Sequence, residues 1–406
     1  MQRSCRQGGC AALLAIFVFL GLEAVAGKGS QVDVTAIKGL FTTPTRLARA
    51  DEIPKFVDDL DLDWMELALQ RQLKHYSRLK LQGTIRYGQD EYPLSQVKES
   101  LEHFLVLTNN YKTCLKHFRR QTCMENLHNR IVHEFKVYVP HLGPKDPRYR
   151  KVNNTFFTGY YTPLIQATDR PTTQFPHAIY GKPLRGPLRR ATRVEIDFDY
   201  VLRGRNLELF YAQDLFELYS MQVEGGGKVE VDVNGSKKAY YLSFDGTNRR
   251  PFRFISKYMM AKGYITNGSS ASQHKFLKEN PNKQREIYSS CPSYVFFKVT
   301  KSPPLGSDEV PLTDNRSIAT DYIFYRFKGG LAFVSSLRPE ANQSTDVEIN
   351  GLLKHRPYSR FVLDQDTGGS IKGKARVDVY WGEGKYASLA ARNTFHNGRI
   401  WFLIKN

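Results

Sequence analysis

The sequence predicts a mostly β protein with a helical region towards its N-terminus, and three observations support this class. Helical periodicity is concentrated before residue 140. Beyond it Gly, Pro, Tyr and Phe become more frequent, and β-branched runs alternate with turn residues. Few helical segments interrupt those runs, which favours barrels over a doubly wound sheet.

The chain opens with an apolar segment. Residues 11–22 form an apolar run behind Arg3 and Arg6, and residues 24–26 read Ala-Val-Ala. A positive start, an apolar run and small residues at a cleavage site predict a secretory signal peptide over residues 1–26. A membrane anchor is the alternative, but the run is shorter than the ~20 apolar residues of a span. The two early cysteines precede the run, so we expect no lipid anchor.

Three helices are expected before residue 140. The first follows the acidic stretch 58–63 and spans residues 64–80, ending in basic residues that suit the helix dipole. The second begins at Ser95, its N-cap, and the third runs from about residue 111 towards 135. We expect these helices to be scaffold without chemistry of their own.

Three cysteines follow the signal peptide. Cys114 and Cys123 are nine residues apart in helical sequence, so a disulfide between them requires a turn between two helices. The sequence leaves that bridge open. We expect Cys291 to be a buried free thiol.

The second half of the chain is expected to be rich in strands. Asn234-Gly235 is a strong hairpin turn signal between two of them. Helices are expected over residues 254–265, with Gly263 as C-cap, and over 269–281. The expected strands span residues 193–202, 228–244, 293–301, 331–337, 375–382 and 399–406.

The sequence offers no motif for a metal or a cofactor. Its ten histidines include no His-x-x-x-His pair, and the chain lacks Cys-x-x-Cys, a Gly-x-x-x-x-Gly-Lys-Ser/Thr phosphate loop and Gly-x-Ser-x-Gly. We therefore expect a protein that works without metal or cofactor.

The formal net charge is +19, and the basic residues are spread along the chain. For an exported protein this charge favours an anionic surface over nucleic acid. Charge alone selects no ligand.

Three aspartates stand out by their neighbours. Asp366 precedes Thr367 and two glycines, Asp378 lies among the apolar residues of 377–382, and Asp321 ends the stretch 316–321. A carboxylate among aromatic and β-branched residues loses hydration, so its pKa rises and it can hold a proton near neutral pH. The glycines after Asp366 let a polymer approach the backbone closely. An ordinary turn is the alternative interpretation of this stretch.

Residues 366–368 form Asp-Thr-Gly, the tripeptide of aspartic proteases. Those enzymes pair two such aspartates, and the chain has no second Asp-Thr-Gly or Asp-Ser-Gly. A protease site would therefore require a dimer, and the chain is long for that design.

Aromatic residues favour a carbohydrate partner. Residues 156–163 read FFTGYYTP, and Tyr380-Trp381 lies beside Asp378. Sugar rings stack on aromatic faces while their hydroxyls need polar groups nearby. Core packing is the alternative for any single ring in a strand.

Several motifs occur together in an order that resembles one family. From about residue 153 to the C-terminus they are FFTGYYTPLIQA, FPHAIYGKP, LFELYSMQVEGGG, CPSYVFFK, VPLTDNRSIATD and LDQDTGGSIKGKARVDVYWG. FTGYYTP together with DTGGSIKG and VDVYWG is the specific combination. In these stretches the chain resembles the MltA family of lytic murein transglycosylases.

The resemblance implies a double-psi β-barrel built from both ends of the chain, with a smaller inserted β domain and a substrate groove between them. The implied parts are a signal peptide over 1–26, a helical region and first barrel part over 27–165, the inserted β domain over 166–290 and the rest of the barrel over 291–406.

The resemblance also implies a reaction. The family cleaves the β-1,4 bond between N-acetylmuramic acid and N-acetylglucosamine of peptidoglycan, and the muramyl C6 hydroxyl closes onto C1 to leave a 1,6-anhydro end. Family members rely on a single aspartate, which matches Asp366. It would protonate the glycosidic oxygen and then take the proton of the C6 hydroxyl. A tethered nucleophile removes much of the need for a second carboxylate.

The remaining site residues are implied by position. Asp378 and Asp321 match family aspartates near the site and would support catalysis. The implied substrate-binding residues are Thr158, Tyr160, Gln222, Gly368, Gly369 and Lys372. The implied partner is the peptidoglycan glycan strand, bound in the periplasm by a monomer that needs no cofactor and binds no nucleic acid. Outer-membrane association and partners in the outer membrane or cell wall stay open.

Two motifs depart from the family pattern. Gln-Gly-Ser-Gly appears here as Gln222-Val223-Glu224-Gly225, and Tyr-Ala-Gly-x-Asn-Gly appears as FDGTNR over residues 244–249. Both lie in the implied inserted domain. They bear on substrate contacts in that domain, whereas the catalytic turn at Asp366 is intact and favours the enzyme. A non-catalytic peptidoglycan-binding module of the same barrel fold is the alternative function.

Overall fold

A computed structural model describes residues 43–406 except 234–235, 344, 350–351 and 369–370. The predicted signal peptide over 1–26 and the Asn234-Gly235 turn lie outside the described residues. Two separate β-sheets dominate the structure, each with its own apolar core.

The larger sheet contains a closed barrel. Its strand order is β1-β4-β16-β13-β14-β12-β15-β5, and an additional pairing of β16 with β5 closes the last six strands into a ring. The pairs β12–β14 and β15–β5 are parallel, and the other pairs of the ring are antiparallel. The strands are β1 (Thr45–Leu47), β4 (Phe135–Pro140), β5 (Thr155–Thr162), β12 (Ser317–Thr320), β13 (Gly330–Pro339), β14 (His355–Asp366), β15 (Arg376–Glu383) and β16 (His396–Lys405). The predicted barrel class, built from both ends of the chain, is confirmed.

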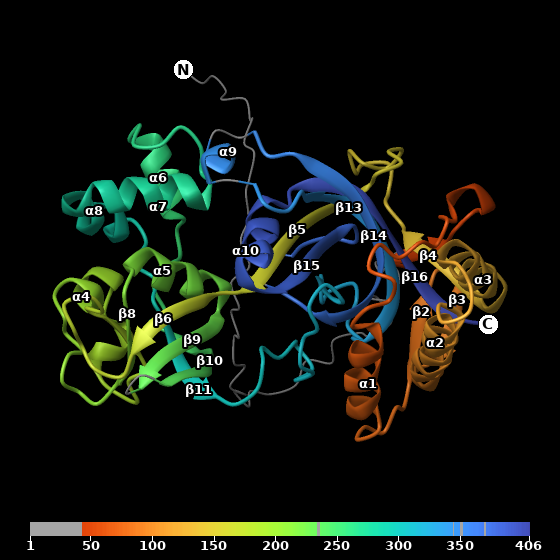
Figure 1. Ribbon diagram of the computed structural model, residues 1–406, viewed down its shortest axis with the longest axis horizontal. Coiled ribbons are helices and arrows are strands. Elements are labelled where there is room, and N and C mark those ends of the chain that lie inside the picture. The colour runs from red at the N-terminus through yellow and green to blue at the C-terminus, as the bar shows by residue number, and fades with distance from the viewer. Residues whose placement is uncertain (1–42, 234–235, 344, 350–351, 369–370) are drawn as a thin grey trace, which may run out of the picture.

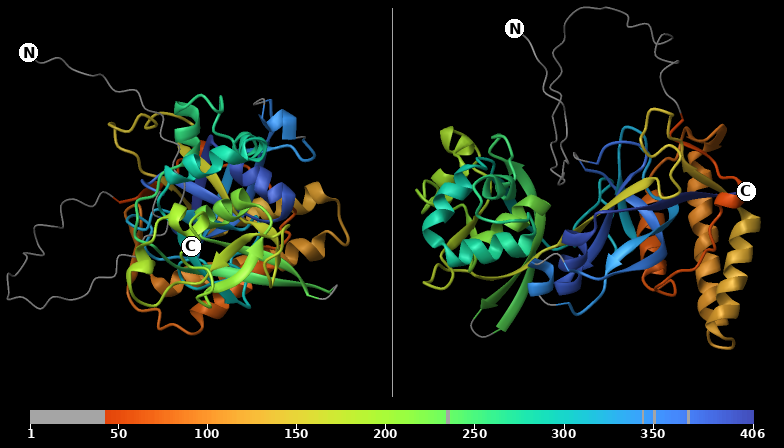
Figure 2. Two further views of the ribbon diagram at one scale, coloured as in Figure 1. Left: turned by 90° about the vertical axis from the view of Figure 1, so that its left-hand side faces the viewer. Right: turned by 90° about the horizontal axis from the view of Figure 1, so that it is seen from above.

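The smaller sheet is built from residues 164–300, between β5 and β12 in the sequence. Its order is β11-β10-β9-β6-β8-β7, and it lies beside the barrel with several helices around it (Figures 1 and 2). The strands are β6 (Leu164–Thr168), β7 (His177–Tyr180), β8 (Glu208–Ala212), β9 (Gly226–Val233), β10 (Ser236–Thr247) and β11 (Val295–Thr300). The helices are α4 (Arg193–Asp197), α5 (Leu215–Glu224), α6 (Ile255–Ala261), α7 (Ser270–Glu279) and α8 (Gln284–Ser289). We call residues 164–300 the inserted domain below; the predicted boundaries at 166 and 290 remain predictions.

The N-terminal helices pack against the outside of the barrel. They are α1 (Met65–Tyr76), α2 (Leu94–Cys114) and α3 (Arg120–Glu134), with the hairpin β2 (Thr84–Tyr87) and β3 (Asp90–Pro93) between the first two. The three predicted helices are therefore present. In the second half, α9 (Thr345–Ile349) and α10 (Gly384–Asn393) complete the set. Among the described residues, no helix has both the length and the apolar character needed to cross a bilayer.

One predicted strand is wrong. Residues 193–202 carry alternating β-branched and polar residues, but they begin with the short helix α4. The Thr192 hydroxyl accepts the Glu195 N–H, and the Glu195 carboxylate accepts the Thr192 N–H at 2.6 Å. This Thr-x-x-Glu capping box satisfies the first N–H groups of a helix and outweighs the strand pattern.

The helices predicted over 254–265 and 269–281 are confirmed as α6 and α7. Gly263 follows α6 with φ of 72°, which a glycine adopts without strain. Helix α5, in contrast, was not predicted. The Asp214 carboxylate caps it by accepting the N–H groups of Phe216 and Glu217.

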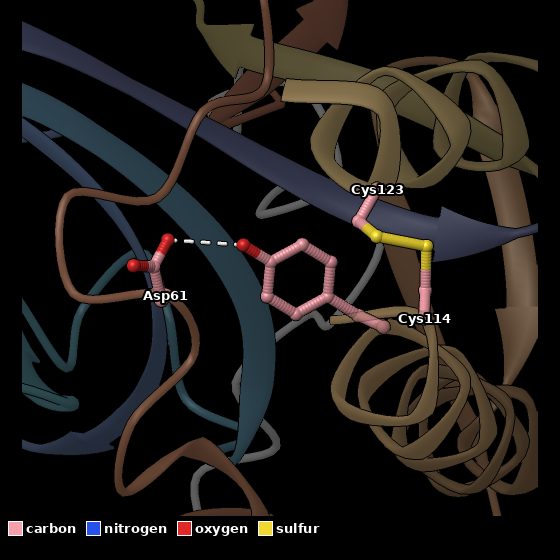
Figure 3. Close-up of a disulfide and its surroundings, with 4 residues drawn as sticks. Asp61, Cys114 and Cys123 are labelled. Carbon is pink, nitrogen blue, oxygen red and sulfur yellow. Dashed lines mark hydrogen bonds between the residues drawn. A yellow bond between two sulfur atoms is a disulfide. The ribbon is translucent and has the colours of Figure 1, made fainter. Parts of the chain in front are cut away.

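A disulfide joins Cys114, at the end of α2, to Cys123 in α3, with the Cα atoms 5.7 Å apart (Figure 3). The turn between the two helices is the one that the spacing requires. Nearby, the Tyr111 hydroxyl donates to the Asp61 carboxylate at 2.9 Å. Cys291 is a buried free thiol, as predicted.

The disulfide should stabilise the helical region. The Cys114→Ser/Cys123→Ser double variant should lose about 2–3 kcal/mol of unfolding free energy, because the unfolded chain is no longer restrained by a loop of this length. Urea unfolding followed by circular dichroism measures the loss. Reductant should reproduce it in the wild type and change nothing in the double variant; an unchanged unfolding midpoint in the variant would contradict the prediction.

Candidate active site

Four neighbouring strands bring two of the predicted aspartates together. Ala319 of β12 is paired with Asp366 of β14 on one side and with Asp378 of β15 on the other. Asp378 is in turn paired with Thr158 of β5. Residues paired across adjacent strands point to the same face, so Asp366 and Asp378 share a face with their Cα atoms roughly 10 Å apart. The barrel thus assembles residues separated by more than 200 positions in the chain.

Asp366 is the last residue of β14 and is only 3% exposed. One carboxylate oxygen accepts the Tyr160 hydroxyl at 3.0 Å, and the other accepts the N–H of Thr367 at 2.8 Å. Burial raises the pKa of Asp366 to about 7, although both hydrogen bonds favour the charged form and lower it. A carboxyl group with this pKa is present in both protonation states near neutral pH.

Tyr160 stays protonated under all physiological conditions. Burial and the charge of Asp366 raise the pKa of its hydroxyl well above the ordinary value. The hydroxyl is therefore a permanent donor to Asp366 and holds the carboxylate in one orientation. Gly159, the preceding residue, permits the close packing of Trp381, because a Cβ there would lie 2.4 Å from the indole nitrogen.

Asp378 is buried on β15, and its carboxylate accepts the Thr158 hydroxyl at 2.7 Å. Burial raises the pKa of Asp378, and the positive charge of Arg376 and the Thr158 hydrogen bond partly offset that effect. Asp378 therefore extends the poorly hydrated carboxyl cluster beyond Asp366.

Asp321 follows β12 and has a different role. One of its oxygens accepts the N–H of Ile323 at 3.0 Å, and the other accepts the N–H of Gly373 at 2.7 Å. Both oxygens thus bind backbone, one of them in the segment that follows Asp366. Asp321 therefore stabilises the position of that segment through backbone hydrogen bonds.

A buried cation lies beside Asp366. Lys328 donates to Asp364 at 3.1 Å and to the Thr320 hydroxyl at 2.7 Å, and Thr320 donates to Asp364 at 2.7 Å. The charge of Lys328 lowers the pKa of Asp366. The Thr367 hydroxyl donates to the Thr320 carbonyl at 2.9 Å, so the same network holds the residue after Asp366.

The remaining predicted substrate-binding residues lie in different surroundings. Gly368 is buried directly after Asp366, and Lys372 is exposed. Gly369 lies outside the described residues. Gln222 is on α5 of the inserted domain; it is buried, and its amide has no hydrogen-bond partner within the described chain.

Sequence reasoning missed two groups. Lys328 carries no motif signal. Glu224 ends α5 in the stretch that departs from the family pattern. Burial and, to a smaller extent, the charge of Asp378 raise the pKa of Glu224 to about 8. The signal in the sequence that could have identified Glu224 was its carboxylate at a position where the family pattern has serine.

Two cavities in the described structure lie away from the three predicted aspartates. One of ≈430 Å³ lies in the inserted domain, and one of ≈650 Å³ lies between β5, β6, α5 and α10. Neither is lined by Asp366, Asp378 or Asp321. In the described ranges, no group of three or more His, Cys, Asp or Glu could hold a metal ion.

Two family models match the chain. The MltA specific insert domain matches residues 186–298, and the 3D domain matches residues 316–404. The first falls within the inserted domain, and the second contains β12 to β16.

Curated relatives agree with these models. The membrane-bound lytic murein transglycosylase A of Vibrio cholerae is 28% identical over 66% of this chain and 70% of its own length. The enzyme of the same name from Escherichia coli K12 is 30% identical over 62% of this chain and 66% of its own length.

Solved structures share the fold. Escherichia coli MltA with bound chitohexaose superposes with a TM-score of 0.65 at 23% identity and covers 90% of this chain and 95% of that chain. A membrane-bound lytic murein transglycosylase from Agrobacterium tumefaciens superposes with a TM-score of 0.62 at 19% identity over 89% and 97%. The family models, the relatives and the shared fold together show that this chain belongs to the MltA family.

Proposed function

We propose that the protein is a lytic transglycosylase that cleaves the β-1,4 bond between N-acetylmuramic acid and N-acetylglucosamine in peptidoglycan and leaves a 1,6-anhydromuramyl end. Two curated relatives are named lytic murein transglycosylases, and one related structure contains chitohexaose. The observation that carries the proposal is the environment of Asp366, whose burial raises the pKa of its carboxyl group to about 7.

Asp366 acts in two steps. In its protonated form it donates to the glycosidic oxygen as the bond from C1 breaks. The resulting carboxylate then takes the proton of the muramyl C6 hydroxyl, whose oxygen bonds to C1, so the aspartate returns to its protonated form. The C6 hydroxyl is tethered to the reacting ring, which raises its effective concentration and makes an activated water unnecessary.

Three residues position the reacting carboxyl group. Tyr160 and the Thr367 N–H bind one oxygen each and fix its orientation. Asp321 braces the following segment through Gly373. The Asp378 carboxylate, which accepts a hydrogen bond from Thr158, keeps this part of the site polar. It can also accept hydrogen bonds from sugar hydroxyls.

The cellular setting is part of the proposal. We propose a periplasmic enzyme that acts as a monomer on glycan strands, which bind in a groove between the barrel and the inserted domain with Gln222, Gly368, Gly369 and Lys372 among their contacts. The names of the two relatives describe membrane-bound murein enzymes, which supports action at the cell wall.

Replacement of the acid should abolish turnover. Asp366→Asn should lower the release of anhydromuropeptides from purified sacculi by about 10²–10⁴-fold, since general acid–base catalysis contributes that much. Mass spectrometry of the soluble products measures the loss, and co-sedimentation with sacculi should be retained. Wild-type products with reducing muramic acid ends would instead identify a hydrolase, and no release by the wild type would favour a binding module.

The raised pKa of Asp366 should also appear in stability. In the unfolded chain its pKa is 3.8, and in the folded protein it is about 7. Folding therefore becomes less favourable as pH rises from about 4 to 7, and the full cost remains above 7. Asp366→Asn should raise the unfolding free energy by on the order of 2–4 kcal/mol at pH 8 and by little at pH 4. Urea unfolding at the two pH values tests this, with the exposed Asp63→Asn as control. A gain that is equal at both pH values would contradict it.

Tyr160→Phe should change the pH profile. Without the hydroxyl, the Asp366 carboxylate loses a stabilising hydrogen bond, so the alkaline limb of kcat/KM should move up by as much as about one pH unit. Rate measurements on soluble glycan strands across pH 5–9 detect the shift. Tyr161→Phe is the matched control, because the Tyr161 hydroxyl accepts from Arg392 instead. Movement of the limb to lower pH would refute the positioning role.

A further inference from the structure

The inserted domain contains a cavity, away from the candidate active site, that has the chemistry of a binding site. It has a volume of ≈430 Å³ and lies between β7, β8 and the segment that includes α4. This size falls in the ~300–1,000 Å³ range of small-molecule pockets. In Figure 1, α4 and β8 lie on the side of the inserted domain remote from β14 and β15. The lining shares no residue with the candidate active site.

Three tyrosine side chains contribute to the cavity wall. Tyr180, Tyr200 and Tyr211 all line it. Tyr180 belongs to the apolar cluster beneath the cavity, whereas Tyr200 is 45% exposed. The Arg203 guanidinium lies over the Tyr200 ring at 4.2 Å from its centre. Arg203 thus covers one face of the Tyr200 ring, and the wall places tyrosine rings beside a polar donor, the combination on which sugar rings stack.

The backbone at Tyr200 is unusual. Its φ is 54°, in the left-handed region that bulky residues rarely adopt. Such conformations persist where the surrounding structure holds them, and they are enriched at ligand sites. Here the conformation coincides with an exposed aromatic ring on the rim of a cavity.

The cavity wall carries two carboxylates, Asp197 and Glu208, and one guanidinium, that of Arg203. Asp197 is 8% exposed and accepts a long contact at 3.4 Å from Arg193, which lies behind the wall. Arg193 directs its other terminal nitrogen to the Ser293 carbonyl at 2.9 Å. The Glu208 carboxylate accepts the N–H groups of Gly204 and Leu207. Carboxylate oxygens can accept further hydrogen bonds from such positions.

Two carboxylates disfavour an anionic ligand, and the Arg203 guanidinium on the wall disfavours a cationic one. A neutral ligand with apolar ring faces and several hydroxyl donors fits this wall best. We propose that this cavity, lined by Tyr180, Tyr200, Tyr211, Asp197, Glu208 and Arg203, is a saccharide-binding site separate from the active site. Building on the proposed function, its ligand is an amino-sugar unit of the same polymer, and its role is to hold the enzyme on the glycan while Asp366 acts.

Binding can be measured without turnover. Full-length Asp366→Asn protein should bind chitohexaose at two sites by isothermal titration calorimetry. Adding Tyr200→Ala and Tyr211→Ala should weaken one of them by about tenfold or more, because aromatic contacts carry that share of sugar affinity. Phe118→Ala, which removes an exposed ring from the turn between α2 and α3, is the matched control and should change neither site. A single binding site in the parent, or equal binding in the tyrosine variant, would overturn the proposal.

A second measurement separates this inference from the proposed function. In the otherwise wild-type enzyme, Tyr200→Ala with Tyr211→Ala should leave the turnover of short soluble glycans unchanged and lower product release from intact sacculi about fivefold or more, as expected when a tethering contact is lost. Equal loss on both substrates, or on neither, would refute the tethering role. Failure of the proposed function would appear differently, as absence of anhydro products from the wild type. Unchanged thermal unfolding of the variant confirms that the fold is intact.

Discussion

The pairing of β5 with both β15 and β16 is the constraint on which the rest of the structure depends. It closes the ring, and it places Thr158 beside Asp378 in the strand register. Two residues further along the same strand, Tyr160 reaches Asp366 at 3.0 Å. Because β5 comes from the N-terminal side of the inserted domain and β14 and β15 from its C-terminal side, the site exists only when the barrel is closed. A local fragment of this chain could not reproduce it.

Closing the barrel removes several ionisable groups from water. An opposite charge replaces the lost hydration of some of these groups and not of others. Asp58 and Arg316 are both fully buried and form two contacts, at 2.6 and 3.0 Å. Burial raises the pKa of Asp58, but the charge and hydrogen bonds of Arg316, the N–H of Phe361 and the charge of Arg360 together outweigh that effect, so the net pKa is lowered. Among the described residues, Asp366 contacts no such cation directly and accepts from the neutral donors Tyr160 and the Thr367 N–H. That difference separates a structural carboxylate, which is paired with a cation, from one that can exchange a proton.

The sequence allowed the β class, the barrel and half of the described α-helices (α1, α2, α3, α6 and α7) to be predicted, because periodicity and turn residues are local signals. Residues 193–202 show where that reasoning fails. Their alternation is typical of a strand, yet a capping box four residues long decides the local structure. Helix α5 was missed because its apolar residues form a compact run without an evident polar face.

The site could be predicted in part. Asp366 was proposed because its stretch resembles a motif of the family, since an Asp-Thr-Gly-Gly turn by itself could equally be an ordinary turn. That Tyr160 donates to it could not be derived from the sequence, since the contact joins positions 206 residues apart through barrel closure. Lys328 was missed for the same reason: a lone lysine becomes informative only when the fold buries it against Asp364.

Glu224 shows why one carboxylate can suffice although a second one is near. A hydrolase of the ordinary type needs an ionised base to activate water while the acid stays protonated. Burial raises the pKa of Glu224 to about 8, so this side chain is mostly protonated at neutral pH and is a poor base. The charge of Asp378 also raises the pKa of Glu224, so the protonation of Glu224 is coupled to Asp378 more than to Asp366. Glu224 is therefore a poor activator of water, whereas the tethered C6 hydroxyl needs only the carboxylate that has just released its proton. The distribution of charge around the barrel strands thus favours an intramolecular ring closure over hydrolysis.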